Sequence, residues 1–277
     1  MNQREREAGE RWCRMVEEEH AQSDSVRSQT PPSADAWRPF AERFRPEVNT
    51  EDPLVLRLLQ EIELHHTVMD VGAGGGRLAL PISLHCKQVV AVEPSVSMGS
   101  VLEEEAQRMQ RDNVVLVAST WEEAEVEPTD MVLCVQVLYT VKDIVSFIRK
   151  LEAYAREKVL VVLSENAPHN QADSLWPGVH GQERLKLPSL RELVQLLWEM
   201  GTYPDVEMLP PQESRGYESR ERALEQLRSR LFVEPGSDEE RRLEEVLKDT
   251  LEERNGRLRI KGGLTRRPGL VSWQPGS

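Results

Sequence analysis

The chain has 277 residues, of which 39% are hydrophobic and 30% are charged, so it is long enough for a globular domain with a substantial core. Its formal net charge of −13 disfavours a nucleic-acid-binding protein, because such proteins neutralise phosphates with Lys and Arg. The N-terminus is too polar for a signal peptide, the apolar runs are too short for a membrane span, and the three scattered cysteines suit a reducing compartment. We therefore expect a cytoplasmic protein without a membrane or nucleic-acid partner.

The N-terminal part of the chain predicts helices joined by a linker. Residues 2–19 form a charged surface helix with an apolar stripe, and residues 20–33 are a polar linker. An amphipathic helix follows, which we expect to pack into the core, and residues 52–64 form another. The apolar positions of the amphipathic helix are Trp37, Phe40, Ala41 and Phe44.

His65 and His66 come directly before the first predicted strand. Two neighbouring histidines resemble a metal-binding pair, but adjacent side chains point apart and no further ligand lies nearby in the sequence. The sequence therefore predicts a solvated turn here and no metal site.

From Thr67 onward, short Val- and Leu-rich runs alternate with helical patterns, which indicates a parallel sheet covered by helices on both faces. The predicted strands are 67–71, 88–92, 114–118, 130–137 and 158–163, with two more at 204–209 and 269–274. The predicted helices between them are 77–85, 95–110, a short stretch at 121–124, 143–156 and 188–201.

The segment before the last strand is highly charged. It predicts two helices, at about 219–231 and 238–254, and Asn255-Gly256 is expected to end the second. The fold class is therefore α/β: a Rossmann-like, doubly wound, mostly parallel seven-stranded sheet with N-terminal helices and a helical insertion before the last strand. We divide the chain into an N-terminal helix and linker (1–34), a cofactor-binding core (35–210), a helical cap (211–262) and a final strand with tail (263–277).

The glycine-rich turn after the first strand is the strongest functional signal. A strand, a glycine turn and a helix bring backbone N–H groups to a nucleotide, and Gly74-x-Gly76-x-x-Ala79 fits a dinucleotide-binding pattern. Asp70 opposes that interpretation, since a carboxylate 4 Å from a phosphate charge costs roughly 4 kcal/mol. S-adenosylmethionine (SAM) carries an ammonium and a sulfonium instead, and Glu93, 23 positions after Asp70, is placed to bind its ribose. An NAD(P)-dependent oxidoreductase and a non-catalytic SAM-binding regulator remain the alternatives.

Asp70-x-Gly72-x-Gly74-x-Gly76, followed by VVAVEPSVSM at residues 89–98, resembles the first two motifs of class I SAM-dependent methyltransferases. NVVLVASTWEEA (113–124) and TDMVLCVQVLYTV (129–141) continue the resemblance, which covers roughly residues 35–210. It implies a methyltransferase with SAM as cofactor. It assigns to cofactor binding the residues Asp70, Gly72, Ala73, Gly74, Gly76, Glu93, Pro94, Met98, Thr120, Trp121, Cys134 and Val135.

The resemblance also implies a role for individual positions. Asp70 faces the ammonium, Glu93 accepts bonds from both ribose hydroxyls, and Pro94 and Met98 border the adenine. Thr120 departs from the family, which has Asp there for the adenine amino group, and Trp121 gives its N–H to the adenine. The pair Cys134 and Val135 passes near the amino-acid end of the cofactor.

The acceptor side is less well defined by the sequence. Gln136 and Tyr139 are expected to face the methyl group, and a long loop after the fifth strand (164–188) supplies polar side chains at the carboxyl edge of the sheet. Candidate catalytic residues are Tyr139, His169 and His180. We expect a small-molecule acceptor, and a basic cluster on this acidic chain favours an anionic one. That cluster consists of Arg257, Arg259, Lys261, Arg266 and Arg267.

Overall fold

The computed structural model describes residues 2–27, 35, 37–38, 41, 45–46, 52–212 and 216–276, apart from the side chains of residues 169–171. Its centre is a seven-stranded sheet in the order β3-β2-β1-β4-β5-β9-β6. Neighbouring strands from β3 to β5 are parallel, and β9 is antiparallel to both β5 and β6. The predicted fold class is confirmed, including the mostly parallel sheet.

The strands lie close to their predicted positions. They are β1 (Thr67–Val71), β2 (Gln88–Val92), β3 (Val114–Val117), β4 (Thr129–Val135), β5 (Ala155–Ser164), β6 (Asp205–Met208) and β9 (Pro268–Trp273). Burial explains this agreement, because the central strands are nearly continuous runs of buried Val, Leu and Met.

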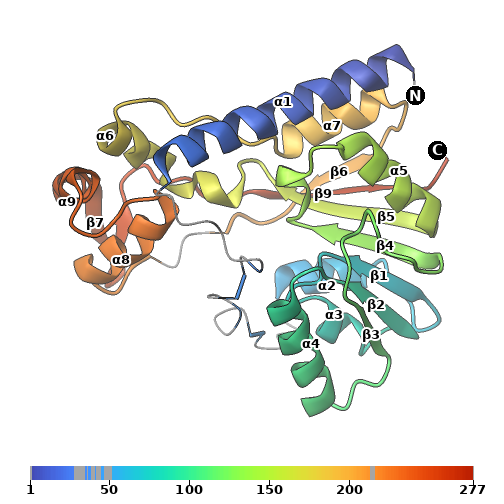
Figure 1. Cartoon of the computed structure of the whole chain (residues 1–277). Helices are drawn as coiled ribbons and strands as arrows, with labels where there is room; N and C mark the ends of the chain where they lie inside the picture. The colour runs from blue at the N-terminus through green and yellow to red at the C-terminus, as the bar shows by residue number, and fades with distance from the viewer. Residues whose placement is uncertain are drawn as a thin grey trace.

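Helices cover both faces of the sheet (Figure 1). One face carries α1 (Gln3–Val26), α5 (Ile144–Tyr154) and α7 (Leu190–Glu199), which pack with the sheet in one apolar cluster. The other carries α2 (Pro53–Leu59), α3 (Ala79–Ile82) and α4 (Val96–Arg108) in a second cluster. The predicted helix 77–85 is reduced to α3, because the residues before it form the turn and Pro81 has no N–H to donate.

The N-terminal helix differs from the expected surface helix. It extends to Val26, and Figure 1 shows it running the length of α7. Trp12 and Val16 are buried, and the Trp12 indole N–H donates to the Val141 carbonyl at 2.9 Å. The apolar face of α1 is narrow, and ion pairs such as that of Glu5 with Arg149 flank it. The helix therefore packs as part of the core.

The helical insertion forms a separate apolar cluster beside the sheet. It contains α8 (Arg220–Arg230) and α9 (Asp238–Thr250) and packs on α6 (Trp176–His180) and the 3₁₀ helix Pro168–Leu175. The predicted end of the second helix is wrong, because β7 (Leu251–Arg254) and β8 (Arg257–Ile260) form a hairpin. Asn255 and Gly256, with φ of 55° and 72°, make its two-residue turn.

Some expectations concern residues outside the described part of the chain. Phe40 and Phe44 of the predicted amphipathic helix lie there, whereas Trp37 is described and is 48% exposed rather than in the core. Among the described residues, no helix is long and apolar enough to cross a membrane.

Candidate functional site

The glycine turn lies at the carboxyl edge of the sheet, between the ends of β2 and β4. Gly72, Gly74 and Gly76 have φ values of 78°, 56° and 91°, which residues with a Cβ rarely adopt. A Cβ on Gly72 would lie 2.4 Å from Val137, and one on Gly76 would lie 2.4 Å from Leu102. The first and third glycines therefore allow close packing, and Gly74 is the one with more open surroundings.

Several N–H groups of the turn are bonded inside the chain. Gly72 and Ala73 both donate to the Val92 carbonyl, at 2.8 and 3.2 Å, and Gly76 donates to the Ala73 carbonyl at 3.0 Å. A phosphate-binding turn needs such N–H groups directed at the ligand. This turn is instead fastened to the end of β2, which argues against the dinucleotide interpretation.

Glu93, the residue after β2, joins the turn to the start of α4. Its carboxylate accepts the Gly74 N–H with one oxygen and the Ser95 N–H with the other, both at 2.8 Å. The residue is 6% exposed, and burial raises the pKa of its carboxyl although these two N–H groups lower it. Each oxygen keeps a second lone pair, so Glu93 can still accept two hydroxyl groups, as its predicted role requires.

Asp70 is the main electrostatic feature of the site. It is 2% exposed, and burial raises its pKa to about 7, although Arg77 and the Ala79 N–H lower it. Its Oδ2 has no hydrogen-bond partner among the described residues. A buried carboxylate oxygen without a donor is costly, so a cationic group of a ligand beside it would satisfy it.

Cys134 and Val135, also predicted for the cofactor site, end β4 next to β1. Cys134 pairs with Val71 in the sheet register, and Cys134 and Val135 are both buried. Burial and the neighbouring Asp70 raise the pKa of the Cys134 thiol. The structure therefore brings these residues together at the same sheet edge.

Asp35 and Ala41, two described residues that precede the sheet, contact the first turn of α4. The Asp35 carboxylate accepts the Ser97 N–H at 2.9 Å and the Ser95 hydroxyl at 2.8 Å, and these bonds lower the pKa of Asp35 to about 2. Ala41 packs with Met98, whose methyl group would lie 3.3 Å from a Cβ on Gly74. The sequence did not indicate this contact, because residues 35 and 95 are far apart and neither belongs to the glycine motif.

The adenine-side predictions are only partly matched by the geometry. Pro94 and Thr120 are exposed, and the Thr120 hydroxyl accepts the Glu123 N–H within its own turn at 3.4 Å. The predicted role of Trp121 is wrong: it is buried, and its indole N–H donates to the Phe147 carbonyl at 3.3 Å. Trp121 is therefore a core residue beneath α5.

On the acceptor side, Gln136 and Tyr139 form one hydrogen-bonded unit with Ser164 at the end of β5. The Tyr139 hydroxyl donates to Gln136 Oε1 at 2.6 Å and accepts the Ser164 N–H at 2.7 Å, and the Ser164 hydroxyl donates to the same Oε1 at 3.2 Å. Burial raises the pKa of Tyr139. The Tyr139 hydroxyl therefore holds the Gln136 amide in place, and the Gln136 backbone has a φ of 62°.

The long loop after β5 is folded rather than open. His180 stacks on Trp176 with ring centroids 4.2 Å apart, and its Nε2 lies 2.8 Å from the Leu231 carbonyl oxygen. Arg184 is buried in an ion pair with Glu19 of α1 and covers the Trp176 ring at 3.9 Å. His180 thus joins the loop to the insertion, and Arg184 joins the loop to α1. The side chain of His169 lies outside the described part of the chain.

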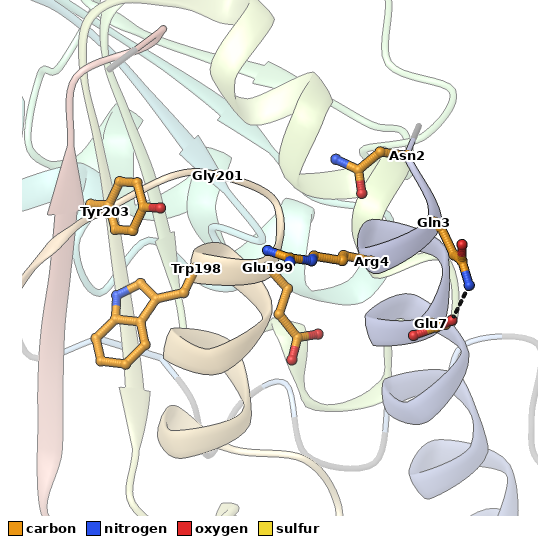
Figure 2. Close-up of a pocket in the computed structure, with 8 residues that line it drawn as sticks. All are labelled: Asn2, Gln3, Arg4, Glu7, Trp198, Glu199, Gly201 and Tyr203. Carbon is orange, nitrogen blue, oxygen red and sulfur yellow. Dashed lines mark hydrogen bonds between the residues drawn. The ribbon is translucent and has the colours of Figure 1, made fainter.

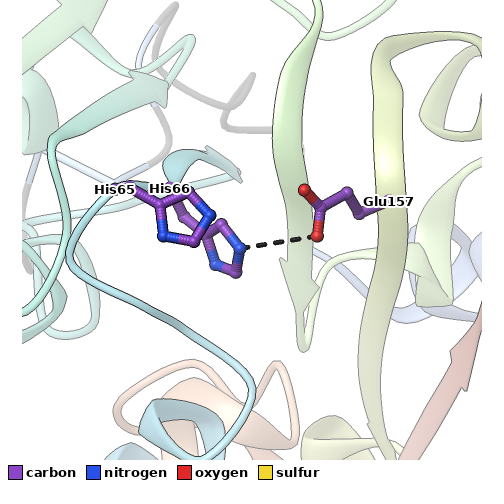
Figure 3. Close-up of side chains that lie close together, drawn as sticks. All are labelled: His65, His66 and Glu157. Carbon is purple, nitrogen blue, oxygen red and sulfur yellow. Dashed lines mark ion pairs between the residues drawn. The ribbon is translucent and has the colours of Figure 1, made fainter.

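His65 and His66 were expected to point apart, and this is wrong. Their ring centroids are 4.4 Å apart, His66 is 5% exposed, and ligand-type atoms of both lie within 4.8 Å of a Glu157 oxygen (Figure 3). However, the Glu63 N–H donates to His66 Nδ1 at 3.0 Å, so the neutral ring carries its proton on Nε2, which faces Glu157 at 3.4 Å. The His66 Nδ1 lone pair is therefore already hydrogen-bonded and is not free to bind a metal ion.

A surface hollow of about 620 Å³ lies elsewhere, between the start of α1 and the end of α7 (Figure 2). Its walls include Arg4, Glu7, Trp198 and Tyr203. The start of α7 meets the carboxyl end of β5, where Ser189 donates to the Glu165 carbonyl, so the end of α7 lies at the opposite edge of the sheet. This hollow is therefore remote from Asp70 and Glu93.

Comparison with known proteins identifies the family and the fold of this chain. A methyltransferase-domain family model matches residues 41–203, more than half of the chain. The structure is similar to the YcgJ protein from Bacillus subtilis (TM-score 0.53, 18% identity) and to a putative methyltransferase from Bacillus halodurans C-125 (TM-score 0.54, 14% identity). Each similarity covers 79% of this chain and 96% of the other, and at these identities it shows the fold. A search of curated protein sequences gives no match.

The family model and the glycine turn, together with the acidic residues that end β1 and β2, lead to one conclusion. The chain belongs to the methyltransferase-domain family, the class I SAM-dependent methyltransferases.

Proposed function

We propose that the protein transfers a methyl group from SAM to a small-molecule acceptor. The observation that carries this proposal is the buried Oδ2 of Asp70, which has no hydrogen-bond partner among the described residues. It lies beside a turn in which the N–H groups of Gly72, Ala73, Gly74 and Gly76 already donate within the chain. A cationic cofactor without phosphates suits that arrangement, and a pyrophosphate does not.

The residues of the site fit this cofactor. Bound SAM would supply a methyl group that is already activated on a sulfonium. Asp70 balances the positive charge, and Glu93 accepts the ribose hydroxyls with its remaining lone pairs. Gly74, which has no side chain, permits close approach of a ligand to the backbone, and Met98 and Ala41 form an apolar contact beside it.

On the acceptor side, the chain positions groups rather than removing protons. Of the three catalytic candidates, the two whose side chains are described are both engaged: Tyr139 with Gln136 and Ser164, and His180 with the Leu231 carbonyl. We infer that the acceptor brings a nucleophile that needs no deprotonation by either residue. The contribution of the protein is then to hold donor and acceptor in line and to exclude water.

Calorimetry on the purified full chain tests the cofactor. We expect SAM and S-adenosylhomocysteine to bind, and NADH and NADPH not to bind. Methyl-labelled SAM should then label the low-mass fraction of a cell extract. Binding of a nicotinamide cofactor in place of SAM would support the oxidoreductase alternative, and tight S-adenosylhomocysteine binding without any transfer would support a regulatory SAM-binding protein.

A further inference from the structure

Arg266 sits at the carboxyl edge of the sheet on a fixed backbone. It lies two residues before β9, whose first residue, Pro268, pairs with Ser164 at the end of β5. The Arg266 N–H donates to the Gln212 carbonyl at 3.1 Å, and the Gln212 N–H donates to the Arg266 carbonyl at 2.7 Å. The side chain therefore starts from a backbone that is held on both sides.

The guanidinium of Arg266 has no anionic partner within the described part of the chain. Its Nε is buried and has no hydrogen-bond acceptor, and no ion pair or side-chain hydrogen bond of Arg266 occurs among the described residues. Burial lowers its pKa, and the positive charges of Arg230 and Arg77 lower it further, while Tyr139 raises it. A partly buried cation among like charges is unfavourable in the free protein.

The other basic residues near the C-terminus have partners or are exposed, although Nε of Arg257 and Nε of Arg259 are also buried without a hydrogen-bond partner among the described residues. Arg257 pairs with Glu218 at 3.5 Å and donates to the Gly216 carbonyl at 3.3 Å, and Arg259 has an interaction of its own. Lys261 and Arg267 are exposed. Of the five basic residues that were expected to favour an anionic acceptor, Arg266 is therefore the best candidate to bind it.

The surroundings of Arg266 connect it to the cofactor site. Arg266 is two residues from Pro268, which pairs with Ser164 in the sheet. The Ser164 N–H donates to the Tyr139 hydroxyl, and that hydroxyl fixes Oε1 of Gln136. Oε1 of Gln136 accepts two hydroxyl groups, and its amide N–H₂ donates to no residue in the described part of the chain, so both donors are available there. The positive charge of Arg77 lowers the pKa of both Arg266 and Asp70.

We propose, resting on the methyl-transfer function above, that Arg266 binds a carboxylate of the methyl acceptor, with the Gln136 amide as a second donor. A guanidinium offers two parallel N–H groups that match the two oxygens of a carboxylate. The neighbouring arginines have other partners: Arg77 is paired with Asp52 at 3.0 Å, and Arg230 has an interaction of its own. Within the part of the chain that the structure describes, Arg266 is then the one cation that the ligand must neutralise, so a ligand with a single negative charge fits best. A phosphate ester, with up to two charges, is less well balanced here.

Arg266→Met tests the proposal, with the exposed neighbour Arg267→Met as the matched control. Thermal unfolding is followed with and without saturating S-adenosylhomocysteine. The probes are butanoate, octanoate, benzoate and phenylacetate, each beside its primary amide, together with phenyl phosphate. In the parent chain at least one carboxylate should raise Tm and its amide should not. Arg266→Met should weaken that binding by at least about tenfold, the loss expected for a charge-assisted hydrogen bond.

The ligand-free variants give a second readout that needs no ligand. Arg266→Met should raise the Tm of the free chain by about 2–4 °C, because it removes a partly buried unpaired charge. Arg267→Met should change neither Tm nor carboxylate binding. A lowered Tm in Arg266→Met would reveal a structural partner and overturn the proposal. Carboxylates that bind no better than amides, that bind the variant equally well or that bind less tightly than phenyl phosphate would also overturn it.

The proposed methyl transfer stands or falls separately. S-adenosylhomocysteine should bind the parent chain and Arg266→Met with the same affinity in calorimetry. Its failure to bind the parent chain would refute the cofactor assignment, while the two Tm comparisons would still decide whether Arg266 is an anion site.

Discussion

The hydrogen bonds that hold the glycine turn itself stay within one β-α-β unit, whereas the long loop after β5 is held by bonds to distant segments of the chain. Gly74 and Glu93 are 19 residues apart, and Ser95 bonds to Glu93 from two residues away. On the acceptor side, His180 meets the Leu231 carbonyl 51 residues later, and Arg184 meets Glu19 across 165 residues. The cofactor half is thus determined by one β-α-β unit, and the acceptor half depends on how separate segments pack.

This difference predicts how each half responds to substitution. A change at the cofactor half should affect cofactor binding strongly and leave the acceptor half folded. A change at the acceptor half should affect acceptor turnover and leave cofactor affinity intact. The predictions below run from the largest expected effect to the smallest.

Glu93→Ala should give the largest loss. It removes the acceptor of the Gly74 and Ser95 N–H groups and the expected acceptor of the ribose hydroxyls. Because hydrogen bonds to a charged group contribute about 1.5–3 kcal/mol each, S-adenosylhomocysteine affinity should fall by about 100-fold or more. Calorimetry measures the affinity. The affinity of Glu93→Gln, which keeps one carbonyl oxygen, should lie between those of Glu93→Ala and the parent chain. Unchanged affinity in Glu93→Ala would remove Glu93 from the site.

Asp70 makes cofactor binding and stability depend on pH in opposite directions. Its pKa in the folded chain is about 7, above the ordinary value of 3.8, so the folded state favours the protonated form. The stability from this group is complete below about pH 4 and is lost as pH rises to about 7. Ligand binding needs the ionised form instead, so S-adenosylhomocysteine affinity should rise by up to about tenfold per pH unit below pH 7.

Asp70→Asn provides the control for this pH dependence. The variant should bind S-adenosylhomocysteine more weakly above pH 7, lose the pH dependence of binding below it, and be more stable than the parent at pH 8. Calorimetry and thermal unfolding from pH 5.5 to 8 measure the two trends. Stronger NADPH binding in the variant, with S-adenosylhomocysteine affinity unchanged, would reverse the cofactor assignment.

The sequence predicted the fold and the glycine turn well because local chemistry determines both. Buried Val and Leu runs locate the strands within a few residues, and the glycines with Asp70 and Glu93 locate the turn. The sequence misplaced features that depend on distant partners. The Trp121 indole N–H donates to the Phe147 carbonyl, and α1 packs against α5 and α7. The Asp35 carboxylate accepts a hydrogen bond from Ser95, 60 residues away.

Other predictions were wrong because the same short sequence pattern can adopt two different structures. Asn255-Gly256 can end a helix or form the turn of a hairpin. Here it forms a hairpin turn, because the residues on either side of it pair as two strands. Adjacent histidines point apart in a helix or strand, but His65 and His66 lie in the turn before β1, where the rings approach each other. Arg266 was grouped with four other basic residues because a sequence does not show which cation lacks a partner.

Gly74→Ala should weaken cofactor binding by about tenfold. Ala at a φ of 56° costs roughly 1–2 kcal/mol, and its Cβ would lie 3.3 Å from the Met98 methyl group, in space assigned to the cofactor. Gly201→Ala is the matched control, since Gly201 has a φ of 83° and no atom within 4 Å of an added Cβ. Both variants should lose similar stability in denaturant unfolding, and only Gly74→Ala should lose S-adenosylhomocysteine affinity. Equal affinity in the two variants would show that the turn does not contact the cofactor.

Tyr139→Phe should have the smallest effect and test the acceptor half. The hydroxyl bridges Gln136 and the Ser164 N–H in a buried place, so its loss should lower stability by about 1–2 kcal/mol. Released from this bond, Gln136 should orient the acceptor less well, raising the acceptor KM several-fold while S-adenosylhomocysteine affinity stays the same. Tyr203→Phe, at a residue that is 75% exposed, should change none of these quantities. A fall in kcat of about a thousandfold with KM unchanged would instead identify the Tyr139 hydroxyl as the group that takes the acceptor's proton, because general-base catalysis contributes about 10²–10⁴-fold.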